Sequence, residues 1–260
     1  MKKIIKKLFY KFLRYQEIET SYEIVSLGSE YGNWKFIKLE NLYNSTIISA
    51  GVGEDISFDI EFINLFKSKV ILVDPTPRAI DHLDEVIMSL GQSNTDGYIE
   101  GGLQKITSYN LEQITLENLV FYKNALWGKS NKTLKFYFPE NEKYVSNTLI
   151  KKTFINTETK YINVLSIDVK EIIEKEKIKE LKLIKIDIEG AEIKAISSML
   201  RNKIYPVQIL LEIDYIRRDT IYSILKTMMF IQKILNNGYK LIKINNYDNY
   251  LFVRKEVFFN

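Results

Sequence analysis

Carboxylates follow two apolar runs in the second half of the chain, and they are the side chains best suited to chemistry. The run LIKI is followed by Asp187 and, two residues on, by Glu189; the run QILL is followed by Glu212 and Asp214. If both runs are neighbouring parallel strands, these acids meet at the carboxyl edge of a sheet, where open α/β sheets bind ligands. Acids that share a site raise one another's pKa unless a cation or proton is shared. The pattern therefore predicts a divalent cation or a carboxylate base, with helix caps and solvated acids as the structural alternative.

A glycine turn follows an earlier apolar run in the stretch TIISAGVGEDISFD. Gly51 and Gly53 would let a ligand approach bare backbone. The dinucleotide fingerprint needs a small residue where this chain has Ile56, and a pyrophosphate disfavours the acids Glu54 and Asp55 beside it. The same two acids would attract S-adenosylmethionine, because its sulfonium and α-ammonium groups are cationic. A short glycine motif is also compatible with a purely structural turn.

The next apolar run, KVILVD, ends in Asp74, at a distance from the glycines where an acid can accept hydrogen bonds from both ribose hydroxyls. Thr76 and Pro77 are typical of the N-cap and first residue of a new helix. A strand, a glycine turn, a helix, a second strand and an acid form a nucleoside-binding half-fold. This half-fold suits NAD as well as S-adenosylmethionine.

These residues need a mostly parallel α/β sheet to position them. Apolar runs alternate with helical spacing through most of the chain, which predicts crossover helices between parallel strands. The predicted strands are 46–50, 69–74, 119–125, 182–187 and 208–214, and the predicted helices are 77–90, 170–180, 189–201 and 219–237. Two further runs, 239–244 and 249–255, flank a short polar turn and predict a closing antiparallel hairpin.

Residues 129–165 interrupt this alternation. Strand-like runs at 133–138 and 161–166 flank a polar segment rich in Asn and Thr. We expect an insertion above the sheet rather than a separate domain.

Composition excludes several kinds of site. The chain has 260 residues, 46% hydrophobic and 27% charged, which is ordinary for a globular protein. It has no cysteine, which excludes disulfides, Cys-ligated zinc and thiol nucleophiles. The single histidine, His82, excludes a His-rich metal site, and we expect it to be a surface or core residue rather than a catalytic base.

The first fifteen residues hold six basic residues and no acid. Subtracting these six leaves 31 basic residues against 33 acidic ones, so the body of the chain does not predict a nucleic-acid partner. Lysines interrupt any signal-peptide core, and no later run is apolar enough to span a membrane. An apolar stripe predicts an amphipathic helix: Ile4, Ile5, Leu8, Phe9, Phe12 and Leu13. Such a helix either packs on its own domain or a partner subunit, as most do, or lies on an anionic membrane. We therefore expect a cytoplasmic protein, with peripheral contact at the inner face of the membrane and homo-oligomerisation as open alternatives.

The motifs ISAGVGEDISFD, VDPTP, NALWG and KIDIEGAE occur in this order, and together they resemble the FkbM-type S-adenosylmethionine-dependent O-methyltransferases. The resemblance covers roughly residues 45–255. It implies a class I (Rossmann-like) methyltransferase fold, a mostly parallel seven-stranded sheet with a C-terminal antiparallel hairpin. For the chain as a whole we expect a basic amphipathic arm of residues 1–30 followed by one methyltransferase domain of residues 31–260. It also implies site residues: Gly51, Gly53 and Glu54 at the methionine end, Asp74 at the ribose, and Asn124 and Ala125 flanking the adenine near Trp127.

We therefore expect an O-methyltransferase that moves a methyl group from S-adenosylmethionine to a hydroxyl of a sugar or sugar nucleotide. Because a sugar hydroxyl has a high pKa, a base (Asp187 or Glu189) or a metal must assist. We favour a cation such as Mg²⁺, Mn²⁺ or Fe²⁺ held by Asp187, Glu212 and Asp214, since converging carboxylates are best explained around a cation. The alternatives are an NAD(P)-dependent nucleotide-sugar oxidoreductase and a non-catalytic binding module that docks through the arm.

Overall fold

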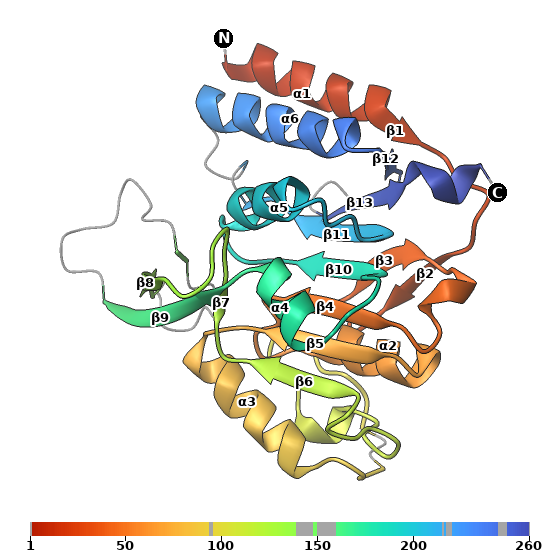
Figure 1. Ribbon diagram of the computed structural model, residues 1–260, viewed down its shortest axis with the longest axis vertical. Helices are drawn as coiled ribbons and strands as arrows, with labels where there is room; N and C mark the ends of the chain where they lie inside the picture. Colours follow the sequence, from red (N-terminus) through yellow and green to blue (C-terminus); the bar gives the residue numbers. More distant parts are fainter. Residues whose placement is uncertain are drawn as a thin grey trace.

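An eight-stranded sheet forms the centre of the protein (Figure 1). The computed structural model describes residues 2–93, 96–138, 148–149, 160–214, 216, 220–243 and 249–259. The strand order is β1-β12-β13-β11-β10-β4-β5-β6. In chain order the strands are β1 Glu17–Ile18, β4 Thr46–Ala50, β5 Lys69–Val73, β6 Leu119–Tyr122, β10 Leu183–Ile186, β11 Gln208–Glu212, β12 Tyr239–Ile242 and β13 Asn249–Arg254. Neighbours pair in parallel except at β13, which is antiparallel to both β11 and β12.

The predicted α/β class, the five parallel strands and the closing hairpin are confirmed. The sheet has one strand more than the seven expected, because β1 pairs with the outer edge of β12. A sheet edge presents unpaired N–H and C=O groups, and the chain leaving the first helix passes this edge and pairs with it.

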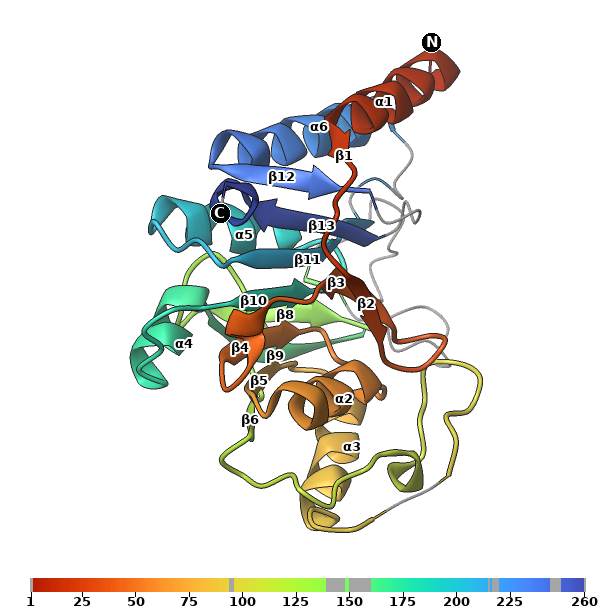
Figure 2. The same ribbon diagram turned by 90° about the vertical axis from the view of Figure 1, so that its right-hand side faces the viewer.

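Helices cover both faces of the sheet (Figures 1 and 2). They are α1 Lys2–Gln16, α2 Ser57–Phe66, α3 Pro77–Met88, α4 Val169–Lys175, α5 Glu192–Arg201 and α6 Ile221–Asn236. Short 3-10 helices are η1 Glu40–Leu42, η2 Ile106–Ser108 and η4 Lys255–Phe258. Successive strand residues point to opposite faces, so Ile48 packs in the core with α1, α4, α5 and α6, and Ile47 packs in the core with α2 and α3.

The predicted helix 189–201 begins three residues late, at Glu192. Glu189 and Gly190 have φ of 52° and 101°, which is left-handed backbone that cannot continue a helix. The predicted strand 119–125 is likewise divided, into β6 and the short strand β7 (Ala125–Leu126).

Strand β7 belongs to a second, three-stranded sheet with β8 (Thr133–Tyr137) and β9 (Tyr161–Ile167), in the order β7-β9-β8. The two strand-like runs of the predicted insertion are thus confirmed. Most of the polar segment between them, 139–147 and 150–159, lies outside the described residues. A further hairpin, β2 (Ile24–Leu27) with β3 (Trp34–Ile37), lies between β1 and β4 in the chain and forms a separate two-stranded sheet.

Helix α1 packs against α6, and Phe9 and Leu13 are 1% and 0% exposed in the core that α6 shares. Its apolar stripe is divided, because Ile4 and Leu8 face solvent. The structure therefore places four of the six stripe residues in or against the protein's own core: Phe9 and Leu13 are buried, and Ile5 and Phe12 are partly buried against them. Within the residues that can be described, no helix is both long enough and apolar enough to cross a membrane.

Candidate active site

A cavity of about 450 Å³ lies at the carboxyl edge of the central strands. The segments that follow β4, β5 and β10 converge on it, because parallel strands end at the same edge of a sheet. The predicted site residues on its wall are Gly51, Gly53, Glu54, Asp74, Ala125, Asp187, Glu189 and Glu212. Loops from the β2–β3 hairpin add Tyr31, Gly32, Asn33 and Trp34, which the sequence did not single out.

Asp74 holds the glycine turn in place. Its Oδ2 accepts hydrogen bonds from the backbone N–H groups of Val52 (2.9 Å) and Gly53 (3.0 Å), and Oδ1 accepts from Thr76 N–H (2.8 Å). The residue is 4% exposed. The predicted ribose contact would therefore use the lone pairs that these three bonds leave. Thr76 is the N-cap of α3, as predicted.

The two glycines have different roles. A Cβ on Gly51 would lie 1.5 Å from the carbonyl oxygen of Asp187, so this glycine lets the end of β4 pack against the end of β10. A Cβ on Gly53 would meet nothing within 4 Å. Gly53 is therefore the position where added bulk would enter open space beside the cavity.

The two acids after the glycines already have partners. Glu54 forms an ion pair with Arg78 of α3 at 2.7 Å. The carboxylate of Asp55 accepts hydrogen bonds from Ser29 Oγ at 2.6 Å and from Ser57 N–H at 3.0 Å. Both acids remain on the wall of the cavity, so they give this side a negative charge that is partly offset at Glu54.

Three of the four predicted acids lie together. Asp187, Glu212 and Asp214 can each place an oxygen within 4.8 Å of the others. Glu192 is a further carboxylate that interacts electrostatically with Asp214 and Asp187, and its Oε1 accepts a hydrogen bond from Gly190 N–H at 2.6 Å. Glu192 is fully buried, and burial, followed by the negative charge of Asp214, raises its pKa well above the usual value. Several carboxylates thus gather at the ends of β10 and β11.

Tyr31 adds a hydroxyl to this end of the cavity. Partial burial raises the pKa of Tyr31, a residue that is 69% exposed as a whole, and the charges of Asp187 and Glu212 raise it further. Because the residue lies in the loop before β3, only the tertiary fold brings it near these acids.

A lysine that the sequence analysis overlooked also lines the cavity. Lys185, in the middle of β10, is 4% exposed, and its Nζ donates a hydrogen bond to the Gly51 carbonyl at 3.3 Å. Nζ also lies 5.3 Å from the centre of the Trp34 ring. Behind it, Asp59 of α2 is fully buried, and burial raises the pKa of its carboxyl to about 6, an effect that the charge of Lys185 opposes. In the sequence, the feature that could have identified Lys185 as a site residue is that it is a single lysine inside the apolar run LIKI.

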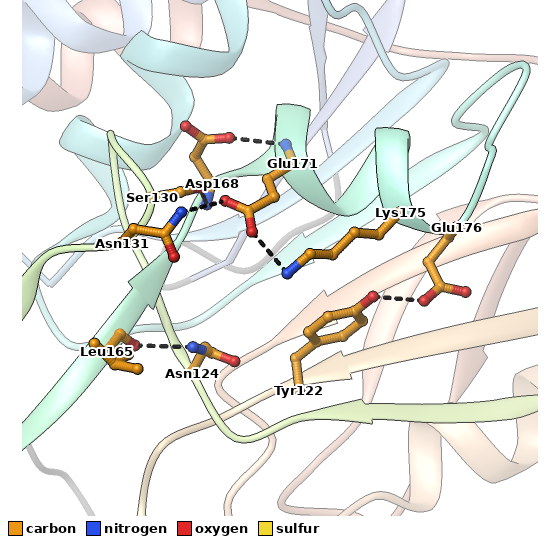
Figure 3. Close-up of polar contacts among 9 residues, drawn as sticks. All are labelled: Tyr122, Asn124, Ser130, Asn131, Leu165, Asp168, Glu171, Lys175 and Glu176. Atoms are coloured by element: carbon orange, nitrogen blue, oxygen red, sulfur yellow. Dashed lines mark hydrogen bonds and ion pairs between the residues drawn. The ribbon is translucent and has the colours of Figure 1, made fainter.

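The predicted residues Asn124 and Trp127 are not among the described residues that line the cavity. The Asn124 amide instead donates a hydrogen bond to the Leu165 carbonyl of β9 at 3.3 Å (Figure 3). The backbone N–H of Trp127 bonds to the Ile167 carbonyl. Both residues thus help to join the chain after β6 to β9.

Figure 3 also shows the polar contacts around α4, beside this connection. Asp168 caps the helix by accepting from Glu171 N–H at 2.9 Å, and Lys175 pairs with Glu171 at 2.7 Å. Tyr122 donates to Glu176 at 2.5 Å. The first two contacts lie within α4 and its N-cap, and the bond from Tyr122 of β6 to Glu176 joins the end of α4 to the sheet.

His82 is buried in α3, where its Nε2 lies 2.9 Å from the Tyr109 hydroxyl, and burial lowers its pKa. His82 is thus a core residue, one of the two positions expected for it, and it is not among the described residues that line the cavity.

Comparison with known proteins identifies the family. The family model of the methyltransferase FkbM domain matches residues 32–241. The fibrillarin pre-rRNA processing protein of Methanococcus jannaschii matches among solved structures with a TM-score of 0.40 and 10% identity, over 90% of this chain and 83% of that chain, which is too distant to assign a shared ligand. The search of curated proteins gave no match. Because the family model spans most of the chain, including the glycine turn and the acids after β10 and β11, the protein belongs to the FkbM methyltransferase family and has its class I, Rossmann-like fold.

Proposed function

We propose that this methyltransferase moves a methyl group from S-adenosylmethionine to a hydroxyl of a sugar or sugar nucleotide, with a divalent cation at the acid cluster. Family membership supports the methyl transfer and its donor. The single observation that carries the finer proposal is the convergence of Asp187, Glu212 and Asp214 within 4.8 Å. Asp187 and Glu212 line the cavity, and Asp214 lies beside them outside its described lining.

The cavity suits the methyl donor. Its volume of about 450 Å³ is typical of small-molecule sites. Val73, Pro75, Ala125 and Leu126 provide an apolar wall beyond Asp74, which suits the adenine ring. The open space at Gly53 admits a ligand close to the backbone. When bound, the donor supplies a methyl group on a positively charged sulfur, so the protein's task is to align the acceptor oxygen and to remove its proton.

The acid cluster suits a hard cation. Carboxylate oxygens are the ligands that Mg²⁺, Mn²⁺ and Fe²⁺ accept, and this cluster has no softer donor among the described residues. Burial raises the pKa of Glu192, the negative charges of Asp214 and Asp187 raise it further, and a cation at the cluster would offset that negative charge. A cation would lower the pKa of a coordinated hydroxyl.

Asp187 and Glu189 are the proposed catalytic residues. Both line the cavity, so either carboxylate could accept the hydroxyl proton. Glu189 has a left-handed φ of 52°, a strained conformation of a kind found at functional sites. The metal and the base are separable, because chelation removes only the first.

The test measures turnover and cofactor binding separately. Methyl transfer to a panel of activated sugars is followed by the mass gain of one methyl group, and binding of S-adenosylhomocysteine by calorimetry. Asp187→Asn should abolish turnover while leaving that affinity within about threefold, since most donor contacts lie after β4 and β5. The matched control is Asp84→Asn, an exposed acid of α3 that pairs with Lys123.

Chelation of the wild type should have the same effect as Asp187→Asn, with turnover restored by Mg²⁺, Mn²⁺ or Fe²⁺. Full turnover after exhaustive chelation would exclude the metal and leave Asp187 or Glu189 as a simple base. Methylation of amines but of no hydroxyl would refute the proposal that the acceptor group is a hydroxyl.

A further inference from the structure

The charges on the wall of the cavity are strongly one-sided. Its acids are Glu54, Asp55, Asp74, Asp187, Glu189 and Glu212, whereas Lys185 is the one basic residue among the described residues that line it. An anion entering this cavity therefore has a single side-chain cation to bind.

Lys185 is held where such an anion could reach it. Its neighbours in β10 are fully buried, and the lysine itself is 4% exposed. An ammonium group has three N–H donors, and within the described part of the chain Nζ meets one hydrogen-bond acceptor, the Gly51 carbonyl at 3.3 Å. The Trp34 ring lies 5.3 Å away on another side. A buried cation with two donors left over is costly unless a further acceptor is bound.

Asp59 does not supply that acceptor. Among the described residues its carboxylate forms no hydrogen bond with Nζ of Lys185, so it acts on Lys185 through its charge at longer range. An anion held in the cavity would complete the coordination of the ammonium.

We propose that Lys185 binds the α-carboxylate of the amino-acid end of S-adenosylmethionine, an inference that rests on the proposed function. The bond from Nζ to Gly51 places the ammonium at the glycine turn. Glu54 and Asp55 stand at the same turn and would repel a carboxylate but attract the α-ammonium beside it. The amino-acid zwitterion thus lies between the lysine and the two acids, with each charge facing its opposite.

The test uses ligands that differ only in the carboxylate. Calorimetry compares S-adenosylhomocysteine with its decarboxylated analogue, and 5′-methylthioadenosine, which lacks the whole amino-acid end, reports on the nucleoside part of the site. The wild type should prefer S-adenosylhomocysteine over the decarboxylated analogue by about 10- to 100-fold, the effect of one charge-assisted hydrogen bond. In Lys185→Met this preference should fall below about threefold, with the affinity for 5′-methylthioadenosine within about twofold of wild type.

The matched control is Lys182→Met, because Lys182 precedes the same strand at its other end and pairs with Glu180. It should keep the full preference. A Lys185→Met variant that folds and keeps the preference would overturn the inference. A wild type with no preference for the carboxylate would also overturn it, and that comparison does not depend on any variant folding. A wild type that binds neither S-adenosylhomocysteine nor 5′-methylthioadenosine would instead refute the proposed function.

Discussion

Replacing Asp74 should destabilise the glycine turn itself, apart from any effect on a ligand. Three backbone N–H groups donate to this carboxylate, those of Val52, Gly53 and Thr76, at 2.8 to 3.0 Å. At 4% exposure, water has little access to replace the lost acceptor. Asp74→Ala therefore leaves three donors without a partner at once.

The magnitude follows from these bonds. A hydrogen bond to a charged group contributes about 1.5–3 kcal/mol, and partial relaxation of the turn recovers part of the sum, so Asp74→Ala should lower the free energy of unfolding by about 3–5 kcal/mol. In Asp74→Asn the remaining oxygen can face Val52 and Gly53, while the new NH₂ group opposes the N–H of Thr76. One bond is lost instead of three, and the expected loss is about 1–2 kcal/mol.

Urea unfolding, followed by circular dichroism, measures both variants against Asp81→Asn, an exposed acid of α3, the helix that follows Asp74, which should behave as wild type. Calorimetry with S-adenosylhomocysteine, run below the unfolding transition, measures the ligand effect separately. Equal stability of Asp74→Ala and wild type would refute the role of Asp74 in holding the glycine turn. Lost binding at unchanged stability would show that Asp74 acts on the ligand alone.

Three further outcomes follow from burial and backbone geometry. Gly53→Asn should fold, because Asn tolerates a φ of 57° and its Cβ meets nothing within 4 Å. It should nevertheless weaken S-adenosylhomocysteine binding at least tenfold, as measured by calorimetry. Gly51→Ala should instead mainly lower the melting temperature, because its Cβ would meet the Asp187 carbonyl. Burial raises the pKa of Asp59 from 3.8 to about 6, so the folded state keeps a proton that the unfolded chain has released. Stability should therefore fall by up to about 3 kcal/mol as the pH rises from about 4 to about 6, and Asp59→Asn should flatten this dependence in urea titrations. Phe9→Ala should cost about 3–5 kcal/mol of unfolding free energy, while exposed Leu8→Ala should change it little; equal effects would refute the packing of α1 on its own domain.

The sheet could be predicted because its strands are buried on both faces. Runs such as KVILV and QILLE are continuous apolar segments bounded by turn residues, and the spacing between them changes to a helical period. The strand β1 could not be predicted in this way. It has two residues, Glu17 and Ile18, and it forms because α1 packs on α6 and brings the chain past the edge of β12.

Asp74, Asp187, Glu212 and Asp214 could be placed because each lies at or near the end of a predicted strand, which fixes its position at the carboxyl edge. Asn124 also follows a strand, yet its side chain bonds to Leu165 of β9. The position of β9 depends on the second sheet, which the order of apolar runs does not specify. Glu192 was overlooked because its place in the first turn of α5 is typical of a solvated acid, whereas the fold buries it completely.

The glycine turn is fixed by the protein before any ligand arrives. Gly51 N–H bonds to the Val73 carbonyl at 3.0 Å, Gly51 O accepts from Lys185, and Asp74 holds the two N–H groups that follow. These contacts come from β5 and β10, on either side of β4, so no single motif contains them. Because the turn is already ordered, a ligand that binds there loses little binding energy to ordering the backbone. One of these contacts also accounts for Lys185, a charged residue inside a strand that is buried on both faces. The contact of Lys185 at the edge of the sheet offsets part of the cost of burying its charge.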